Sequence, residues 1–173
     1  MTSSGELRDA LLSAVAPLPN TAGGTAIVLA TANSPPAMTL LSSGDILVDG
    51  DTVRLAVFAD NSVVSQLGGS CTLLVPTSGG ALRVSLQPAV ARRAGLLAVI
   101  EGEIVSLRPS TEPPWSLRLD FVPAEERGRE AFVDYWTRVR FWLEQGALVI
   151  PLVIPPAPTA PNSNQLDRVA APF

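Results

Sequence analysis

The sequence contains no histidine and no lysine, and Cys71 is its only cysteine among 173 residues. Without histidine there is no imidazole to act as a general base, to activate a nucleophile, or to bind zinc or haem iron. Without lysine there is no Schiff base and no lysine of a phosphate-binding loop. A single cysteine cannot form an intramolecular disulfide or a multi-thiolate metal site. Chemistry must therefore come from carboxylates, hydroxyls, arginines, backbone amides or a bound cofactor.

Charged residues are also scarce, at 16% of the chain against 47% hydrophobic residues. Twelve basic residues, all arginine, are outnumbered by 16 acidic ones, which gives a formal net charge of −4. This acidic balance argues against nucleic acid as a partner, because phosphate binding needs a basic face. So little charge favours an oligomer, in which apolar surface is covered by another subunit.

Long apolar runs are missing as well. The longest one, 147–154, is interrupted by Pro151 and is much shorter than the ~20 residues that span a bilayer. The first residues show no basic start followed by an apolar run, which is the pattern of a secretory signal. We therefore expect no membrane partner and a cytoplasmic location.

The length fits one domain, which we assign to residues 1–150, followed by a proline-rich arm or tail at 151–173. Ser3 and Glu6 have the spacing of a capping box, and apolar residues then recur at helical intervals. This pattern predicts a helix over 5–16. A second helix is predicted over 124–145, because aromatic and aliphatic residues recur there at steps of three and four.

Between these helices the sequence is rich in β-branched and alternating apolar residues. Asp49-Gly50-Asp51 is typical of a hairpin turn, Pro76 is expected to end a strand, and Gly102 indicates a bulge or a close backbone approach. Asn61 and Ser62 are candidate caps for a short helix. The predicted strands cover 25–32, 37–42, 46–48, 52–59, 70–75, 81–86, 96–107 and 115–122. The pattern predicts a mainly β domain with a barrel over 25–122, and a sandwich is the competing architecture.

The stretch from Ala26 to Leu107 resembles the FMN-binding split barrel of the pyridoxamine 5′-phosphate oxidase-like superfamily. The resemblance lies in the opening strand and turn at 27–33, the hairpin at 46–57, the segment 60–67 and the strand at 71–75. It implies a six- to seven-stranded antiparallel split β-barrel, with a short helix between strands 3 and 4 and a C-terminal helix. It also implies a homodimer that holds flavin at the subunit interface.

The short helix carries the family pattern Ser-x-Lys/Arg-x-x-Asn-Leu only in part. Ser62 matches the serine, Val64 replaces the basic residue that usually helps to hold the flavin phosphate, and Gln66 stands where asparagine is common. Hydroxyls and backbone amides can still bind an anion at such a position. The alternative is that Asn61 or Ser62 only caps this helix. The candidate cofactor-binding residues are Thr39, Ser42, Arg54, Ser62, Ser65 and Gln66.

Several of these residues have a plainer interpretation. Thr39 and Ser42 fall in the second-strand region that lies along the cofactor in the family, but they can also be ordinary strand residues. Arg54 could replace the missing cation, although strand alternation favours a solvent-facing position. Arg92 and Arg93 could recognise an anion or lie in a solvated loop.

Few other groups suggest chemistry. Cys71 sits in an apolar strand, where a small buried thiol is expected. Glu101 and Glu103 share a strand face and could form an acid–base pair or a weak cation site, although nothing else supports that. We predict no metal site and assign no catalytic residue.

These observations leave two functions open. One is a homodimeric flavoprotein that binds FMN and acts as an oxidoreductase on a small molecule, since the flavin itself then carries hydride or electrons. The other is a non-catalytic barrel dimer that has lost flavin affinity and serves as a binding or structural module. A deazaflavin in place of FMN is a third, less favoured alternative.

Overall fold

The computed structural model describes residues 3–19, 24–78, 80–94, 96–110, 120–121 and 126–145. The proline-rich segment 151–173 lies outside these residues. The elements are α1 (Ser4–Val15), β1 (Gly24–Thr31), β2 (Met38–Ser42), the 3-10 turn η1 (Ser43–Asp45), β3 (Ile46–Asp49), β4 (Thr52–Phe58), α2 (Ser62–Ser65), β5 (Cys71–Thr77), β6 (Gly80–Ala94), β7 (Leu97–Ser110), β8 (Asp120–Phe121) and α3 (Glu126–Gln145).

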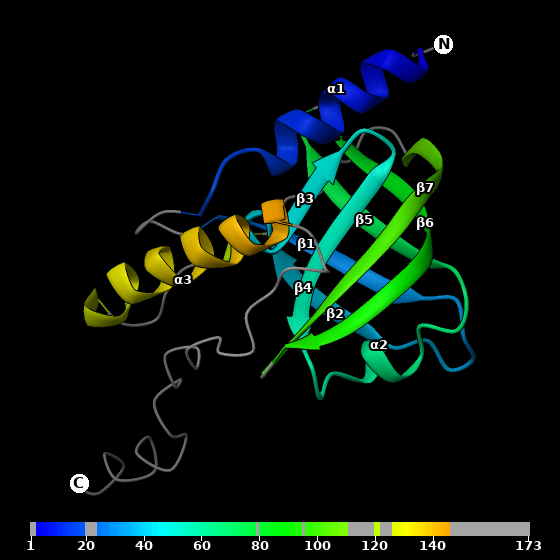
Figure 1. The fold of residues 1–173 in the computed structure, drawn as a ribbon. Coiled ribbons are helices and arrows are strands. Elements are labelled where there is room, and N and C mark those ends of the chain that lie inside the picture. Colours follow the sequence, from blue (N-terminus) through cyan, green and yellow to red (C-terminus); the bar gives the residue numbers. More distant parts are fainter. Residues whose placement is uncertain are drawn as a thin grey trace, which may run out of the picture.

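The described strands form one antiparallel sheet in the order β2-β1-β5-β6-β7-β4-β3, and β8 pairs with β1. The sheet curls into a barrel (Figure 1). Its two end strands, β2 and β3, are joined along the chain by η1 and not by a strand ladder. The predicted mainly β, antiparallel split barrel is confirmed. The predicted short helix is α2, but it lies between β4 and β5 and not between strands 3 and 4. The reason is that residues 46–49 form a separate strand, β3.

Local chemistry accounts for most strand boundaries. Gly50 closes the β3–β4 hairpin with a φ of +58°, a conformation that glycine adopts without steric cost. Gly102 lies beside a bulge in β6, and a Cβ there would lie 2.9 Å from the Gln87 carbonyl oxygen, so the predicted close approach is confirmed. The predicted end of β5 at Pro76 is wrong: Pro76 pairs with Ala81. It is tolerated because it stands beside the turn, where few ladder bonds remain to be lost.

Helices cover the barrel at both ends and on one side (Figure 1). The predicted N-terminal helix is confirmed, and Ser3 and Glu6 form its capping box. Leu11 and Val15 of α1 are buried in the core inside the barrel, and so is Val63 of α2. No described helix has both the length and the apolar character needed to cross a membrane.

A second, smaller core lies on the outer face of the sheet. Val139 and Leu143 of α3 are buried there against Ala56 of β4 and against Leu97 and Val99 of β7. The predicted C-terminal helix is therefore confirmed over its described residues, and it packs outside the barrel. Alternate residues of β4 and β7 thus serve two separate cores.

Candidate functional site

An apolar pocket of about 240 Å³ lies between the barrel wall and α3. We use the name apolar pocket for the space lined by Ala26, Thr39, Leu40, Leu41, Ser42, Asp45, Ala56, Val57, Phe58, Leu97, Phe132, Tyr135 and Trp136. The strands supply mostly aliphatic side chains, and α3 supplies three aromatic rings. Such a lining suits a flat, largely apolar ligand with a few fixed polar contacts.

The polar end of this pocket is built by the turn η1. Asp45 Oδ2 accepts hydrogen bonds from the Ser42 backbone N–H (2.9 Å) and from the Ser42 hydroxyl (2.7 Å). Ser42 Oγ in turn accepts from the Gly44 N–H (3.1 Å), and Ser42 and Asp45 form a capping box. The Trp136 side chain donates a further hydrogen bond to Asp45. A three-residue turn thereby holds a carboxylate against the aromatic face of α3.

Burial dominates the electrostatics of this carboxylate. Desolvation raises the pKa of Asp45 from 3.8 to about 6, although the hydrogen bonds from Ser42 and Trp136 and the positive charge of Arg140 act to lower it. Tyr135 has its pKa raised too, first by burial and then by the negative charge of Asp45. Ionisable groups with shifted pKa values in a cleft are typical of functional sites.

Gly44 lets α3 come this close. A Cβ at Gly44 would lie 2.7 Å from the Trp136 side chain, so any larger residue would force the indole away. Arg140 of α3 completes the junction, since its Nη2 donates to the carbonyl oxygens of Val15 (2.8 Å) and Ser43 (2.5 Å). One guanidinium thus joins α3, the end of α1 and η1.

A second pocket, of about 420 Å³, lies at the α2 end of the barrel. We call it the basic pocket, and it is lined by Ala59, Asp60, Asn61, Val64, Ser65, Ala91, Arg92, Arg93 and Ala98. Two arginines and one aspartate give it a net charge of +1. Arg93 is oriented by a hydrogen bond from its Nη2 to the Ala59 carbonyl oxygen (3.1 Å).

The two pockets adjoin. Thr39 of the apolar pocket accepts a hydrogen bond from the Asn61 side-chain amide of the basic pocket (2.9 Å). Phe58 and Ala59 are chain neighbours that line one pocket each. β2 carries Thr39 at this contact and Ser42 at the polar end of the apolar pocket. The two pockets are therefore neighbours, with the Asp45 carboxylate lining one and Arg92 and Arg93 lining the other.

Three of the six predicted cofactor-binding residues line this site. Thr39 and Ser42 line the apolar pocket, and Ser65 lines the basic pocket. The Ser65 hydroxyl donates to the Ser62 carbonyl oxygen (2.8 Å). Their contact with a cofactor stays a prediction.

Ser62 and Gln66 do not line either pocket. Ser62 is the exposed first residue of α2, and the capping role belongs to Asn61, whose Oδ1 accepts from the Val63 N–H (3.0 Å). Gln66 Oε1 accepts from the Thr31 hydroxyl (2.8 Å) and from the Ala37 N–H (3.2 Å). The structure thus gives Gln66 a part in fixing the β1–β2 turn.

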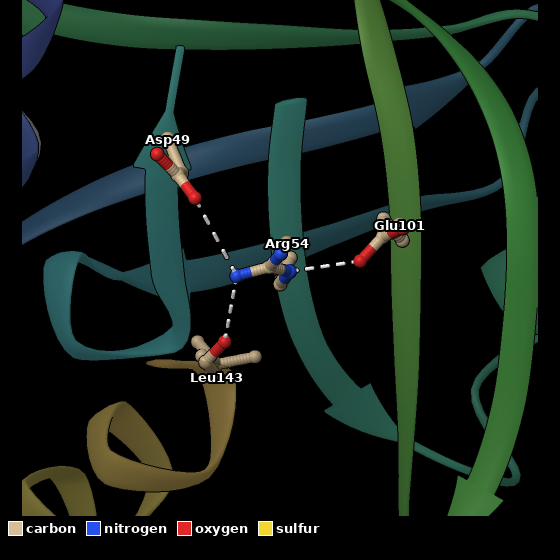
Figure 2. A network of polar contacts seen from close by, with 4 residues as sticks. All are labelled: Asp49, Arg54, Glu101 and Leu143. Carbon is tan, nitrogen blue, oxygen red and sulfur yellow. Dashed lines mark hydrogen bonds and ion pairs between the residues drawn. The ribbon is translucent and has the colours of Figure 1, made fainter. Parts of the chain in front are cut away.

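Arg54 lies on another part of the barrel wall and reaches neither pocket. As Figure 2 shows, its guanidinium sits between Glu101, Asp49 and the Leu143 carbonyl oxygen. Nε lies 2.8 Å from Glu101 Oε2, while Nη1 lies 3.2 Å from Leu143 O and 4.0 Å from Asp49 Oδ2. Glu101 is therefore occupied by an ion pair, and no metal-ligand cluster with Glu103 is found in the described part of the chain.

The site also contains residues outside the six predicted cofactor-binding ones. Arg92 and Arg93 lie in β6 and not in the expected loop. Asp45 was missed altogether, although the spacing Ser-x-x-Asp from Ser42 is that of a capping box and could have drawn attention to it. Cys71 is buried as expected, and burial raises the pKa of its thiol to about 11.

No protein-family model matches the chain, and no curated protein matches it in sequence. Solved structures of similar fold do exist. The NADH:FAD oxidoreductase of Streptomyces globisporus is 12% identical, with 58% of this chain and 81% of that chain covered and a TM-score of 0.45. The flavin reductase of the styrene monooxygenase of Pseudomonas putida is 11% identical, with 59% and 88% covered and a TM-score of 0.45.

A candidate pyridoxamine 5′-phosphate oxidase of Listeria innocua is 13% identical, with 62% of this chain and 100% of that chain covered and a TM-score of 0.45. Similarities at such low identity and TM-score support no conclusion about what this chain binds or catalyses.

Proposed function

We propose that this chain is a flavin-binding split-barrel protein that holds FMN along β2 and acts as an oxidoreductase on a small molecule. The observation that carries this proposal is the joining of an apolar, aromatic-lined pocket to a basic pocket. FMN consists of a flat ring system and a phosphorylated side chain. The ring system fits the apolar pocket, and the phosphate fits the neighbouring basic pocket. A bound flavin would supply hydride or electron transfer, which a protein without histidine and lysine can then support by binding and by excluding water.

The basic pocket fits a phosphate in spite of Val64. Val64 lines the pocket without charge, and the positive charge comes from Arg92 and Arg93 of β6. Arginine binds phosphate well because its planar donors match the oxygens of the anion. The Asn61 amide and the Ser65 hydroxyl border the same space, while Asp60 reduces the net charge.

The apolar pocket fits the ring system. Thr39 and Ser42 offer hydroxyl groups along β2, and Phe132, Tyr135 and Trp136 cover the opposite side. In this arrangement the chain orients the ring between strand and helix and keeps bulk water from most of its surface. The side of the apolar pocket that is open to solvent, which we call its mouth, leaves room for a small-molecule substrate at the exposed edge of the ring.

We further propose that a second copy of the chain covers this mouth. Met38 and Leu40 of the end strand β2 are 65% and 66% exposed, and Phe58 and Leu96 nearby are also exposed. Exposed apolar side chains gathered beside a pocket favour a protein partner, and an end strand offers unpaired backbone groups to it. Light scattering tests the dimer, and Leu40→Glu is expected to give a monomer.

Titration of FMN and of riboflavin, followed by flavin fluorescence, tests the cofactor assignment. The wild type is expected to bind FMN more tightly than riboflavin, which lacks the phosphate. The double variant R92A/R93A is expected to lose about tenfold to a hundredfold in FMN affinity, since charge-assisted hydrogen bonds are lost. Its affinity for riboflavin is expected to stay unchanged.

Arg83→Ala is the matched control, because Arg83 is an exposed arginine of the same strand that lines neither pocket. It removes one positive charge and is expected to leave both affinities unchanged. If the wild type binds neither flavin at high micromolar concentration, the flavoprotein function is wrong. A dimer that persists without flavin binding would then favour the non-catalytic barrel module.

A further inference from the structure

Asp45 places a carboxylate at the polar end of the apolar pocket, where one end of a bound ring would lie. It lines the apolar pocket together with Ala26, Ala56 and Val57, which offer no polar side-chain group. Burying a carboxylate in such surroundings is costly unless its oxygens are hydrogen-bonded. The carboxylate of Asp45 is therefore stabilised when hydrogen-bond donors surround it on every side, including the side that faces the pocket.

The residues that the structure describes supply only part of them. An ionised carboxylate accepts about four hydrogen bonds. The described residues give Asp45 three donors, namely the Ser42 N–H, the Ser42 hydroxyl and the Trp136 side chain. The described residues supply no donor for the remaining acceptor site, and Asp45 lines the pocket in which a ligand would lie.

We propose that Asp45 is the recognition residue of the apolar pocket and that it accepts a hydrogen bond from a ring N–H of the bound ligand. The inference rests on the proposed function for the identity of this ligand. The oxidised flavin ring carries a single N–H, at N3, flanked by two carbonyl groups. That imide edge is a hydrogen-bond donor at the polar end of an otherwise apolar ring, which matches the single carboxylate at the end of the pocket.

Neighbouring groups hold Asp45 in this role. Around it, α3 presents Arg140 and Tyr135, and Glu144 acts on Arg140 from the same helix. The strands that line the pocket contribute Thr39 and Ser42 but no charged side chain besides Asp45. Arg140 is engaged with the carbonyl oxygens of Val15 and Ser43, so its nearby charge favours the ionised carboxylate without using up the acceptor site.

The protonation state of Asp45 makes this recognition depend on pH. Burial raises the pKa of Asp45 to about 6, so the carboxylate is ionised at pH 7.5 and protonated at pH 5. Only the ionised form has a full set of acceptor sites. Affinity for a ligand that donates an N–H is therefore expected to fall as the pH drops through about 6.

The experiment compares FMN with 3-methyl-FMN, which lacks the N–H, in equilibrium titrations from pH 5 to pH 8. The wild type is expected to prefer FMN at pH 7.5, and this preference is expected to shrink about tenfold at pH 5. In Asp45→Asn the preference is expected to be about tenfold smaller at pH 7.5 and independent of pH, since a charge-assisted hydrogen bond is replaced by a neutral one.

Two controls make the result specific. A steric clash of the methyl group would penalise the wild type and Asp45→Asn alike, so the coupling between the variant and the methylation isolates the N–H contact. Asp134→Asn removes an exposed carboxylate from α3 and is expected to behave as the wild type. The pH series on the wild type keeps the test valid should Asp45→Asn fail to fold.

The outcomes separate the inference from the proposed function. If the wild type binds FMN with a preference over 3-methyl-FMN that neither pH nor Asp45→Asn changes, Asp45 is not the recognition residue, and the flavin assignment stands. If the wild type binds neither compound at any pH, the proposed function and this inference both fall. A preference that depends on both pH and Asp45 supports the inference.

Discussion

Arg54 and Arg140 perform the same task in two regions of the molecule, with different results. Each guanidinium donates to a carbonyl oxygen near the C-terminal end of a helix, Leu143 O for Arg54 and Val15 O for Arg140. Neither helix has a basic residue in its own last turn, so each takes its cation from elsewhere in the chain. Positive charge at this end of a helix is favourable because it complements the helix dipole.

The difference lies in how completely the surrounding polar groups are satisfied. Arg54 has a carboxylate partner at 2.8 Å in Glu101, and a second one in Asp49. Arg140 donates to two carbonyls, its buried Nε has no hydrogen-bond partner among the described residues, and burial lowers its pKa. The network around Arg54, in which charges are paired, stabilises the fold. Polar groups beside a pocket that still have unused hydrogen-bonding atoms, as around Arg140, are typical of binding sites.

The largest expected effect comes from removing the two arginines in turn. Arg140→Met is expected to lower the free energy of unfolding by about 3 kcal/mol, because it removes two hydrogen bonds from a charged donor. The Ser43 carbonyl oxygen keeps the Ile46 N–H as a donor, whereas the Val15 carbonyl oxygen loses the side-chain donor that it has among the described residues. Arg54→Met is expected to cost about 1 kcal/mol, because Glu101 and Asp49 are more exposed than the carbonyls at the Arg140 junction. Urea denaturation followed by tryptophan fluorescence measures both. Equal losses would remove the distinction between the two regions.

The pH dependence of stability gives the next largest effect. The pKa of Asp45 is raised from 3.8 in the unfolded chain to about 6 in the fold, so the folded state binds this proton more tightly. The resulting stabilisation is complete below about pH 4 and is lost as the pH rises through 6. A shift of this size corresponds to about 3 kcal/mol at most.

Asp45→Asn removes this titration. The stability of the wild type, measured relative to this variant from pH 3.5 to pH 8, is expected to fall as the pH rises. A difference between the two proteins that stays constant over the whole range would show that Asp45 titrates normally.

An effect smaller than that of Arg140→Met concerns the close packing of η1 on α3. Gly44→Ala is expected to cost about 2 kcal/mol, since the new Cβ would overlap the Trp136 side chain. Gly68→Ala is the matched control, because a Cβ there meets nothing within 4 Å. Thermal unfolding measures both variants. A neutral Gly44→Ala would mean that the indole can move aside, and that the junction is less tightly built than the Arg54 network.

Much of the fold could be predicted from the sequence because its signals are local. The capping box of Ser3 and Glu6, the turn at Gly50 and the aromatic periodicity of α3 each act within a few residues. The site could be predicted only in part. Thr39 and Ser42 were found through a family pattern, whereas Asp45 depends on Trp136, which is distant in sequence and near only once α3 has packed on the barrel.

The arginines show the same limit. Strand alternation says which face of a strand a residue occupies, but not which helix end lies above it. Arg54 was therefore a plausible cofactor ligand until Leu143 and Glu101 were seen around it. The sequence leaves Arg92 and Arg93 open between anion recognition and a solvated loop, because the predicted strand before them ends at 86. The pairing with β7 extends β6 through them, and it brings them over α2.

The junction at η1 also bears on the order in which the molecule is assembled. Its hydrogen bonds join residues that are 26, 97 and 125 positions apart in the chain. Closing contacts of such long range costs chain entropy that must be offset by structure already formed. α3 follows all the described strands of the barrel in the chain, so it is synthesised after them. α3 supplies the aromatic side chains of the apolar pocket, so a nascent chain can enclose a ligand there only once α3 has docked on the barrel.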